Sequence, residues 1–197
     1  MRLERQGGGS VRAVPKPFEP TVQAAKAGDD VAVTVLYQDH VAMVYGYFRA
    51  CGAPDPDDLT SEVFLGMLRG LNKFNGGQPD FRRWLMTIAH RRLVDSRRRQ
   101  GKNKIDLSEP ASLATLPAEG ASSELRTVEI DSDLVDAFRR LTDSQREVLA
   151  LRFLADVSLQ DVAGITGRPT GAVKSLQNRG LESLRRNLPA PKARLEA

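Results

Sequence analysis

Cysteine and histidine are scarce in this sequence, and each scarcity excludes a class of site. Cys51 is the only cysteine among 197 residues, which excludes an intramolecular disulfide and a cysteine-based zinc cluster. His40 and His90 are the only histidines and have no second ligand close by in the sequence, so we predict no metal site and no cofactor. We interpret each histidine as a surface or capping residue, and Cys51 as a small buried hydrophobic residue.

Catalytic motifs are missing as well. Gly76 and Gly77 are not followed by the Lys and Ser or Thr that complete a phosphate-binding loop. No nucleophile, base and orienting acid can be nominated together from the other residues. We therefore predict that the chain is not an enzyme.

Long hydrophobic runs are also lacking. The longest strongly apolar stretch without charge, residues 41–48, is far shorter than the roughly 20 residues that span a bilayer. The first 20 residues contain glycines and prolines where a signal peptide needs an apolar core. We expect a cytoplasmic protein without membrane insertion, whose residues 1–20 form a flexible arm.

Charge is abundant and unevenly distributed, although the formal net charge is only +4. Residues 82–104 contain nine Lys or Arg residues against one acid, Asp95. Residues 106–136 contain eight acids against one base, Arg126. The basic stretch indicates an anionic partner such as nucleic acid, and the change of sign indicates two folded parts joined by an acidic connector.

Apolar residues recur at helical spacing, and no stretch alternates long enough to suggest a sheet. We predict an all-α fold of two small helical domains joined by a flexible acidic linker. The predicted boundaries are a first domain at 21–100, a linker at 101–128, a second domain at 129–188 and a tail at 189–197.

Two helices can be placed in the first domain. Asp57 and Asp58 precede apolar residues spaced by four, so we expect their carboxylates in the first turn of a helix, where the helix dipole favours them. Pro79 and the glycines before it break the chain, and the next helix is expected to begin near Asp80.

The second domain has the pattern of a helix-turn-helix. Ser158 is expected to cap a short helix, residues 164–168 to form the turn, and Thr170 to cap the following helix. The following helix has an apolar side that includes Val173 and Leu184. Its other side carries the donors that a recognition helix needs for base edges and phosphates. An ordinary antiparallel helix pair with a solvated basic face remains the alternative. The donors are Lys174, Ser175, Asn178, Arg179 and Arg186.

Aromatic residues lie next to the basic stretch of the first domain. Phe74, Phe81 and Trp84 could stack on unpaired bases while the arginines that follow hold phosphates, as in single-strand-binding surfaces. Aromatic residues at helical spacing are also typical of a hydrophobic core. Phe74 lies in a loop and has less core to join than the other two, so we expect it to be the base contact.

Two blocks of sequence resemble the extracytoplasmic-function sigma factors, group 4 of the sigma-70 family. The first block resembles their region 2 and consists of DDLTSEVF at 57–64, then Phe74, then FRRWLMTIA at 81–89. The second block resembles their region 4 and consists of LTDSQREVL at 141–149, then GAVKS at 171–175. The resemblance covers about 21–188, and it implies that the first domain is sigma region 2 and the second a region 4 helix-turn-helix.

The resemblance also implies three sets of functional residues. Core RNA polymerase, through its largest subunits, would be bound by Asp57, Asp58, Glu62, Val63 and Phe64. The −10 element of promoter DNA would be captured and melted by Phe74, Asn75, Phe81, Trp84, Arg91, Arg97 and Arg98. The −35 element would be read by Arg168, Thr170, Lys174, Ser175, Asn178 and Arg179. Helix capping by the aspartates and a core position for Val63 are compatible with these roles.

The predicted function is therefore transcription initiation by a sigma factor, with an anti-sigma factor as a further partner. The acidic linker would thread toward the polymerase active centre, where its charge fits mimicry of RNA, or would be a solvated tether. The main alternative is a stand-alone helix-turn-helix regulator with an N-terminal sensing or dimerisation domain, which leaves residues 57–64 without a role. A protein-interaction adaptor would leave the arginine-rich surfaces without one.

Overall fold

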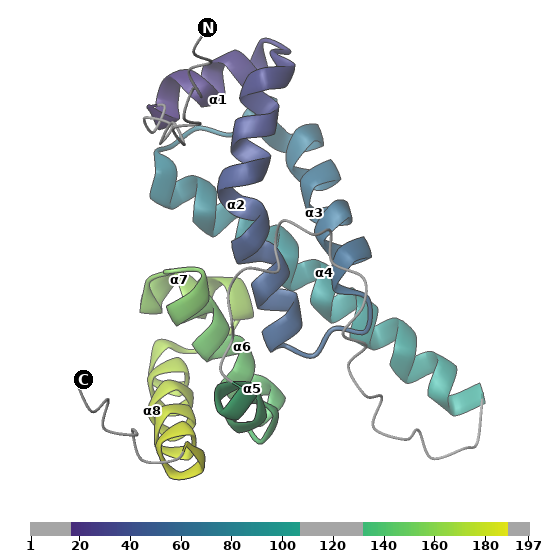
Figure 1. Cartoon of the computed structure of the whole chain (residues 1–197), viewed down its shortest axis with the longest axis vertical. Coiled ribbons are helices and arrows are strands. Elements are labelled where there is room, and N and C mark those ends of the chain that lie inside the picture. The colour runs from purple at the N-terminus through teal and green to yellow at the C-terminus, as the bar shows by residue number, and fades with distance from the viewer. Residues whose placement is uncertain (1–16, 107–131, 189–197) are drawn as a thin grey trace, which may run out of the picture.

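The structure is a computed structural model that describes residues 17–106 and 132–188, with side chains described for 17–100 and 136–188. All regular elements within these ranges are helical, which confirms the predicted all-α fold of two helical parts (Figure 1). Of the predicted linker at 101–128, residues 101–106 continue the helix that begins at Gln78, and the rest lies outside the described residues. Of the predicted N-terminal arm at 1–20, residues 18–20 begin the first helix, whereas residues 1–16 lie outside the described residues, as does the predicted tail at 189–197. In the described ranges, no helix combines the length and apolarity that a bilayer crossing requires.

The N-terminal part is a bundle of four helices. They are α1 (Phe18–Lys26), α2 (Asp30–Ala50), α3 (Pro56–Gly70) and α4 (Gln78–Asp106), with a 3-10 turn η1 (Leu71–Lys73) before α4. Helix α1 packs on α2, and α3 packs on both α2 and α4. Tyr47, Phe48 and Phe81 are the largest fully buried side chains of this bundle.

Local sequence explains where the helices of this bundle begin. The Asp55 carboxylate accepts a hydrogen bond from the backbone N–H of Asp58, and Pro56 stands at the first helical position, where a missing N–H costs nothing. Asp57 and Asp58 lie in the first turn of α3, as predicted. Helix α4, expected near Asp80, begins at Gln78 and continues to Asp106.

The C-terminal part has four further helices and a π-helical turn. They are α5 (Ser132–Arg139), α6 (Asp143–Leu149), the turn η2 (Ala150–Leu154), α7 (Leu159–Thr166) and α8 (Thr170–Asn187). Thr142 and Gln145 form a reciprocal capping box at the start of α6. Helices α6 and α7 both pack on α8.

The predicted helix-turn-helix is present, with two corrections. Residues 164–166, predicted to belong to the turn, are the last residues of α7. Ser158 caps α7, and Gly167 ends it with φ 66°, a left-handed conformation that favours glycine. Thr170 is not the cap of α8, contrary to the prediction. The carbonyl of Pro169 already accepts hydrogen bonds from Ala172 and Val173, so Thr170 is the first residue inside the helix.

A glycine allows α8 to lie close to α6. A Cβ atom added at Gly180 would lie 2.9 Å from Cδ1 of Leu149, a separation that real Cβ contacts do not show. The buried side of α8 also includes Val173 and Leu184, which confirms the predicted apolar face.

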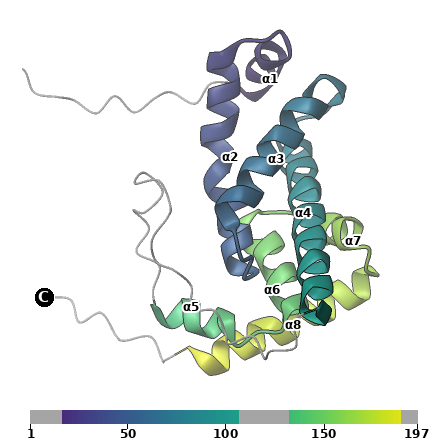
Figure 2. The same ribbon diagram turned by 90° about the vertical axis from the view of Figure 1, so that its right-hand side faces the viewer.

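The two helical parts are in contact. The turn η2 packs on α2, and α7 packs on α4 (Figure 2). We call this contact, of η2, α6 and α7 with α2 and α4, the seam. Buried apolar residues from both parts, including Val44 and Leu151, belong to one continuous core cluster.

Candidate nucleic-acid and polymerase interfaces

Helix α8 presents polar side chains on the side opposite its buried face. Lys174, Asn178 and Arg179 are exposed, and Ser175 is half-buried. No ion pair within the described residues engages Lys174 or Arg179. Their charges are therefore available to an anionic partner, and the helix that carries them is fixed by its apolar face.

The turn that precedes α8 is tied back to α6 by Arg168. Its Nη1 donates to Oε2 of Glu147 at 3.0 Å, and its Nη2 donates to Oγ of Ser144 at 3.1 Å. Thr170, beside it, is exposed. Of the six residues predicted to read the −35 element, Arg168 is thus the one already engaged by other side chains of its own domain.

The three aromatic residues predicted for −10 recognition form a compact cluster. The rings of Phe74 and Trp84 stack with centroids 5.2 Å apart, and Phe81 meets each of them edge to face. Phe81 is fully buried, and Trp84 is half-buried. A Cβ at Gly70 would lie 2.7 Å from Trp84, so the absence of a side chain at Gly70 gives the indole its place.

Phe74 is buried, with 8% of its surface exposed. The expectation that it has less core to join than the other two aromatic residues is therefore wrong for Trp84, which is half-buried, although Phe81 is more deeply buried still. The loop from Phe74 to Gly77 is short and is held at both ends, and the Phe74 ring packs on Phe81 and Trp84. Lys26 of α1 donates to the Phe74 carbonyl at 2.5 Å, and the N–H of Gly77 donates to the Asp80 carboxylate at 3.1 Å. Asn75, the next residue, is exposed.

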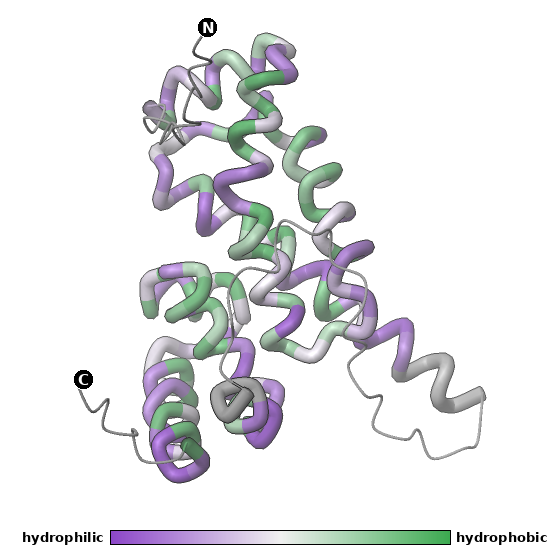
Figure 3. The backbone as a smooth tube through the Cα atoms, viewed as in Figure 1, coloured by the Kyte–Doolittle hydropathy of each residue, from purple (hydrophilic) through white to green (hydrophobic). Residues whose placement is uncertain are grey.

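The arginines of α4 differ in their surroundings. Arg91 and Arg98 are exposed, and the coloured part of α4 just before its grey end is hydrophilic (Figure 3). Arg97 is held by two acceptors, the Glu147 carboxylate at 2.5 Å and the Cys51 carbonyl at 3.0 Å. The structure therefore separates the arginines predicted for −10 DNA into two exposed ones, Arg91 and Arg98, and one that is bound across the seam.

The residues predicted for polymerase binding lie on α3, with two exposed acids. Asp57 and Asp58 are exposed, whereas Glu62 forms an ion pair of 3.3 Å with Arg92. Val63 and Phe64 are buried, which is the core position that the sequence left open for Val63. Of the five residues predicted to bind polymerase, the two aspartates are therefore the exposed ones.

Apolar residues that the sequence analysis did not nominate are exposed near this acidic turn. Leu65 and Leu68 of α3 are about half exposed, and Tyr37 of α2 stacks edge to face on Phe64 with centroids 4.7 Å apart. The two leucines are three residues apart in the sequence. This spacing is equally typical of a buried helix face, so it does not predict that they are exposed.

Both histidines are buried at interior positions of a helix, contrary to the interpretation as surface or capping residues. His40 hydrogen-bonds the Leu36 carbonyl through Nδ1 at 2.9 Å, and Nδ1 of His90 lies 3.1 Å from the Tyr47 hydroxyl. Burial lowers the pKa of each imidazole below its ordinary value of 6.5. Each histidine thus forms a hydrogen bond with a buried polar group. The sequence pattern does not reveal these partners.

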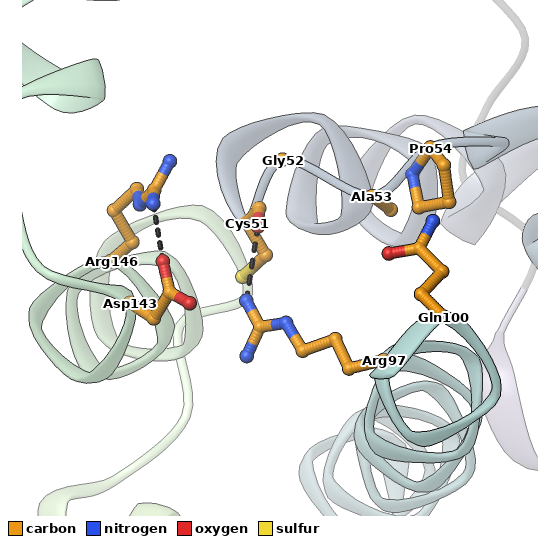
Figure 4. Close-up of a pocket in the computed structure, with 8 residues that line it drawn as sticks. All are labelled: Cys51, Gly52, Ala53, Pro54, Arg97, Gln100, Asp143 and Arg146. Carbon is orange, nitrogen blue, oxygen red and sulfur yellow. Dashed lines mark hydrogen bonds and ion pairs between the residues drawn. The ribbon is translucent and has the colours of Figure 1, made fainter. Parts of the chain in front are cut away.

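Cys51 is buried, as predicted, and lines a cavity of about 330 Å³ at the seam. Arg97 borders this cavity from α4, while Asp143 and Arg146, which form an ion pair, border it from α6 (Figure 4). Burial raises the pKa of the Cys51 thiol to about 12. The thiol is therefore protonated at neutral pH, and its residue lines a cavity that both parts of the molecule border.

Comparison with known proteins identifies both parts. Residues 36–103 match Sigma-70 region 2, and residues 137–186 match Sigma-70, region 4. The ECF RNA polymerase sigma factor BldN of Streptomyces coelicolor is 37% identical over 172 residues, 85% of this chain and 64% of BldN. SigD of Mycobacterium tuberculosis is 30% identical over 179 residues, 85% of this chain and 82% of SigD. The chain thus spans slightly less than two thirds of BldN and most of SigD.

A solved structure shares the fold. The sigma factor RpoE of Bartonella quintana, in complex with the anti-sigma factor NepR, has a TM-score of 0.59 at 22% identity, covering 80% of this chain and 98% of that one. The fold and the donor face of α8 define a two-domain helical DNA-binding protein. The chain belongs to the extracytoplasmic-function sigma factors of the sigma-70 family. The predicted resemblance and sigma-factor function are confirmed, and a stand-alone regulator is not favoured.

Proposed function

We propose that this sigma factor brings core RNA polymerase to promoter DNA in the cytoplasm, reads the −35 element with α8 and opens the −10 element with α4 and the loop before it. The observation that carries the proposal is the division of α8 into a buried apolar side and an exposed side with Lys174, Asn178 and Arg179. Such a division lets a helix be fixed to its own domain while its donors enter a groove. The proposal involves no covalent chemistry.

For the −10 element, Asn75, Arg91 and Arg98 are exposed. We infer that arginines hold the phosphates of the separated strands, while Asn75 and the half-buried Trp84 meet unpaired bases. Phe74 supports Trp84 through their stacked rings and reaches a base only if the loop rearranges.

For polymerase binding, we infer that the exposed acids at the start of α3 meet a basic surface of the largest subunits. Val63 and Phe64 hold α3 to the bundle from behind, and this fixes the direction in which Asp57 and Asp58 point. An anti-sigma factor that competes with polymerase is a further proposed partner. It is supported by the relatives' structures, since RpoE was solved in complex with one.

Charge reversal on α3 tests polymerase binding. Asp58→Lys should weaken assembly with core polymerase at least tenfold, because a lysine repels a basic partner surface. Asp30→Lys is the matched control, since Asp30 is an exposed acid in the first turn of α2 and its reversal opposes the helix dipole in the same way. The measurement is titration of core polymerase with labelled sigma factor.

The holoenzyme then tests promoter recognition. Selection of bound duplexes from a random-sequence library should give two conserved elements at a fixed spacing. Equal assembly by the two charge-reversal variants would contradict the α3 surface. If the selected sequences shared only one conserved element, the proposal that α8 and α4 recognise separate promoter elements would be contradicted.

A further inference from the structure

Helix α1 is attached to the loop before α4, although it precedes the residues 36–103 that match Sigma-70 region 2. The Phe18 ring at its start meets the Phe81 ring edge to face, with centroids 5.4 Å apart. Lys26, in its last turn, is half-buried, and its Nζ donates to the Phe74 carbonyl at 2.5 Å. Helix α1 thus contacts both the aromatic cluster and the first residue of the loop.

The other end of the loop is fixed by α4 itself. Gly76 has φ 151°, which favours glycine, and a Cβ atom there would lie 2.7 Å from Cβ of Asp80. The Asp80 carboxylate accepts from the N–H of Gly77 at 3.1 Å and from Nη2 of Arg83 at 3.1 Å. Asn75 therefore stands exposed between two points of attachment.

The two attachments differ in how far they reach along the chain. Asp80 is three residues from Gly77, so the first turn of α4 forms that contact locally. Lys26 is 48 residues from Phe74, so the other contact depends on the packing of α1. A hydrogen bond from an ammonium group is stronger than one between neutral groups. Lys26 therefore holds the peptide group that joins Phe74 to Asn75.

We propose that Lys26 is a positioning residue for recognition of the −10 element. Its ammonium group fixes the Phe74 carbonyl, and this sets the direction of Asn75 and keeps the Phe74 ring stacked on Trp84. The inference rests on the proposed function, in which Asn75 and Trp84 meet unpaired bases. A loop that is already ordered loses less conformational entropy when a base binds, and it adapts less well to the wrong base.

Replacement of Lys26 tests this role in the holoenzyme. Lys26→Met removes the donor and keeps an unbranched side chain. In selection from the random-sequence library, base preference at one or more −10 positions should fall by up to about tenfold, the size of one well-placed base contact. The −35 preference should stay unchanged, because α8 reads it. Lys26→Arg retains a cationic donor and should keep most of the −10 preference, and an equal loss in this variant would contradict the proposal.

Lys73→Met is the matched control for charge. Lys73 is exposed and directly precedes Phe74, so its replacement removes the same charge beside the same loop. The control should keep the −10 preference of the parent. An equal loss of preference in Lys73→Met and Lys26→Met would assign the effect to charge and overturn the role of the hydrogen bond.

Salt dependence distinguishes positioning from direct contact with DNA. A Lys26 side chain that neutralised a phosphate would weaken binding of every sequence alike, and its loss would reduce the slope of log affinity against log salt by about 0.9. Such a change in slope with unaltered base preference would make Lys26 a phosphate contact and overturn the proposal.

Trp84 reports the position of the loop in the free chain. It is the only tryptophan, it is half-buried, and it stacks on Phe74 with ring centroids 5.2 Å apart. Release of the loop should expose the indole, so acrylamide should quench its fluorescence more strongly in Lys26→Met than in the parent. Quenching in Lys26→Arg and Lys73→Met should match the parent, and equal quenching in all four chains would show that Lys26 does not hold the loop.

The outcomes of the selection separate this inference from the proposed function. If the parent selects two elements and Lys26→Met selects the same −10 element with equal preference, the inference is overturned and the proposed function stands. A Lys26→Met chain that fails to assemble with core polymerase, or that also loses the −35 preference, would make Lys26 a residue of the fold and overturn the inference too. If the parent itself selects no −10 element, the proposed function fails, and the role of Lys26 fails with it.

Discussion

Phe74 shows how the surroundings of one residue change the result expected from its replacement. Its ring is stacked on Trp84 and buried against Phe81, so Phe74→Ala should lower the free energy of unfolding by about 3–5 kcal/mol. Asn75→Ala, at the exposed next position, should change it by less than about 0.5 kcal/mol. Chemical denaturation of both variants measures the difference.

The same pair of variants separates folding from promoter opening. Asn75→Ala keeps the fold, so a defect on a duplex promoter that is rescued on a pre-melted one would be a direct effect on base capture. An Asn75→Ala variant that opens both templates like the parent would exclude Asn75 as a base contact. A Phe74→Ala variant with full stability would instead show that the loop leaves the aromatic cluster easily.

The exposed basic residues of α8 should contribute to the salt dependence of DNA affinity. Lys174→Ala and Arg179→Ala should each reduce the slope of log affinity against log salt by about 0.9, if each side chain neutralises one phosphate. Arg139→Ala removes the same charge from an exposed position on α5 and should leave the slope unchanged. Fluorescence anisotropy with promoter DNA over a range of salt concentrations measures it. Equal slopes for all three variants would exclude phosphate contacts by α8.

At the scale of elements, the contact of α6 with α8 depends on a missing side chain. Gly180→Ala should destabilise the C-terminal domain by about 1–3 kcal/mol, because the new Cβ would collide with Leu149. Gly171→Ala, near the start of the same helix, meets nothing within 4 Å and should stabilise it by about 0.5–1 kcal/mol. Thermal unfolding of the two variants should shift in opposite directions, and equal shifts would contradict the close approach.

The helices themselves could be predicted because their signals are local. The period of apolar residues, the aspartates before α3 and Ser158 before α7 are each read within a few residues of sequence. Thr170 was assigned wrongly because Pro169 already supplies the first helical carbonyl, and both residue types occur at helix starts. The inward turn of Phe74 escaped prediction because Lys26, which holds its loop, lies 48 residues earlier.

For the whole molecule, the two buried histidines predict a loss of stability in acid. Burial lowers the pKa of His40 and His90, so between their folded pKa values and 6.5 the unfolded chain binds more protons than the folded one. The free energy of unfolding therefore rises with pH across this window, and stability is lost as the pH falls below about 6.5. Glu147 opposes this effect at His90, although desolvation outweighs it.

Thermal unfolding at about pH 7.5 and about pH 5.5 measures the effect, since these values bracket the ordinary pKa of histidine. A variant with Gln at both His40 and His90 keeps a polar side chain at each position and should lose less stability on acidification. An equal loss in the variant and the parent would assign the effect to carboxylates instead.

The seam could not be predicted from the sequence, because the sequence does not show which residues of the two parts contact each other. Arg97 and Glu147 lie in separate helices whose local patterns are complete without one another. The charge pattern indicated a basic stretch followed by an acidic connector. Among the described residues, Arg82, Arg83 and Arg97 of α4 each pair with an acid of the C-terminal domain, and nothing in the spacing of these acids marks them.

The tie between Arg168 and α6 has a consequence for how sharply promoters are distinguished. Because both partners of Arg168 belong to its own domain, the turn before α8 keeps its conformation whether or not the two domains touch. The conformational entropy of that turn is then lost during folding and not again on DNA binding, which favours affinity. A recognition helix fixed in this way also cannot shift to accommodate a mismatched base pair, so each mismatch should cost its full interaction energy of about 1–3 kcal/mol.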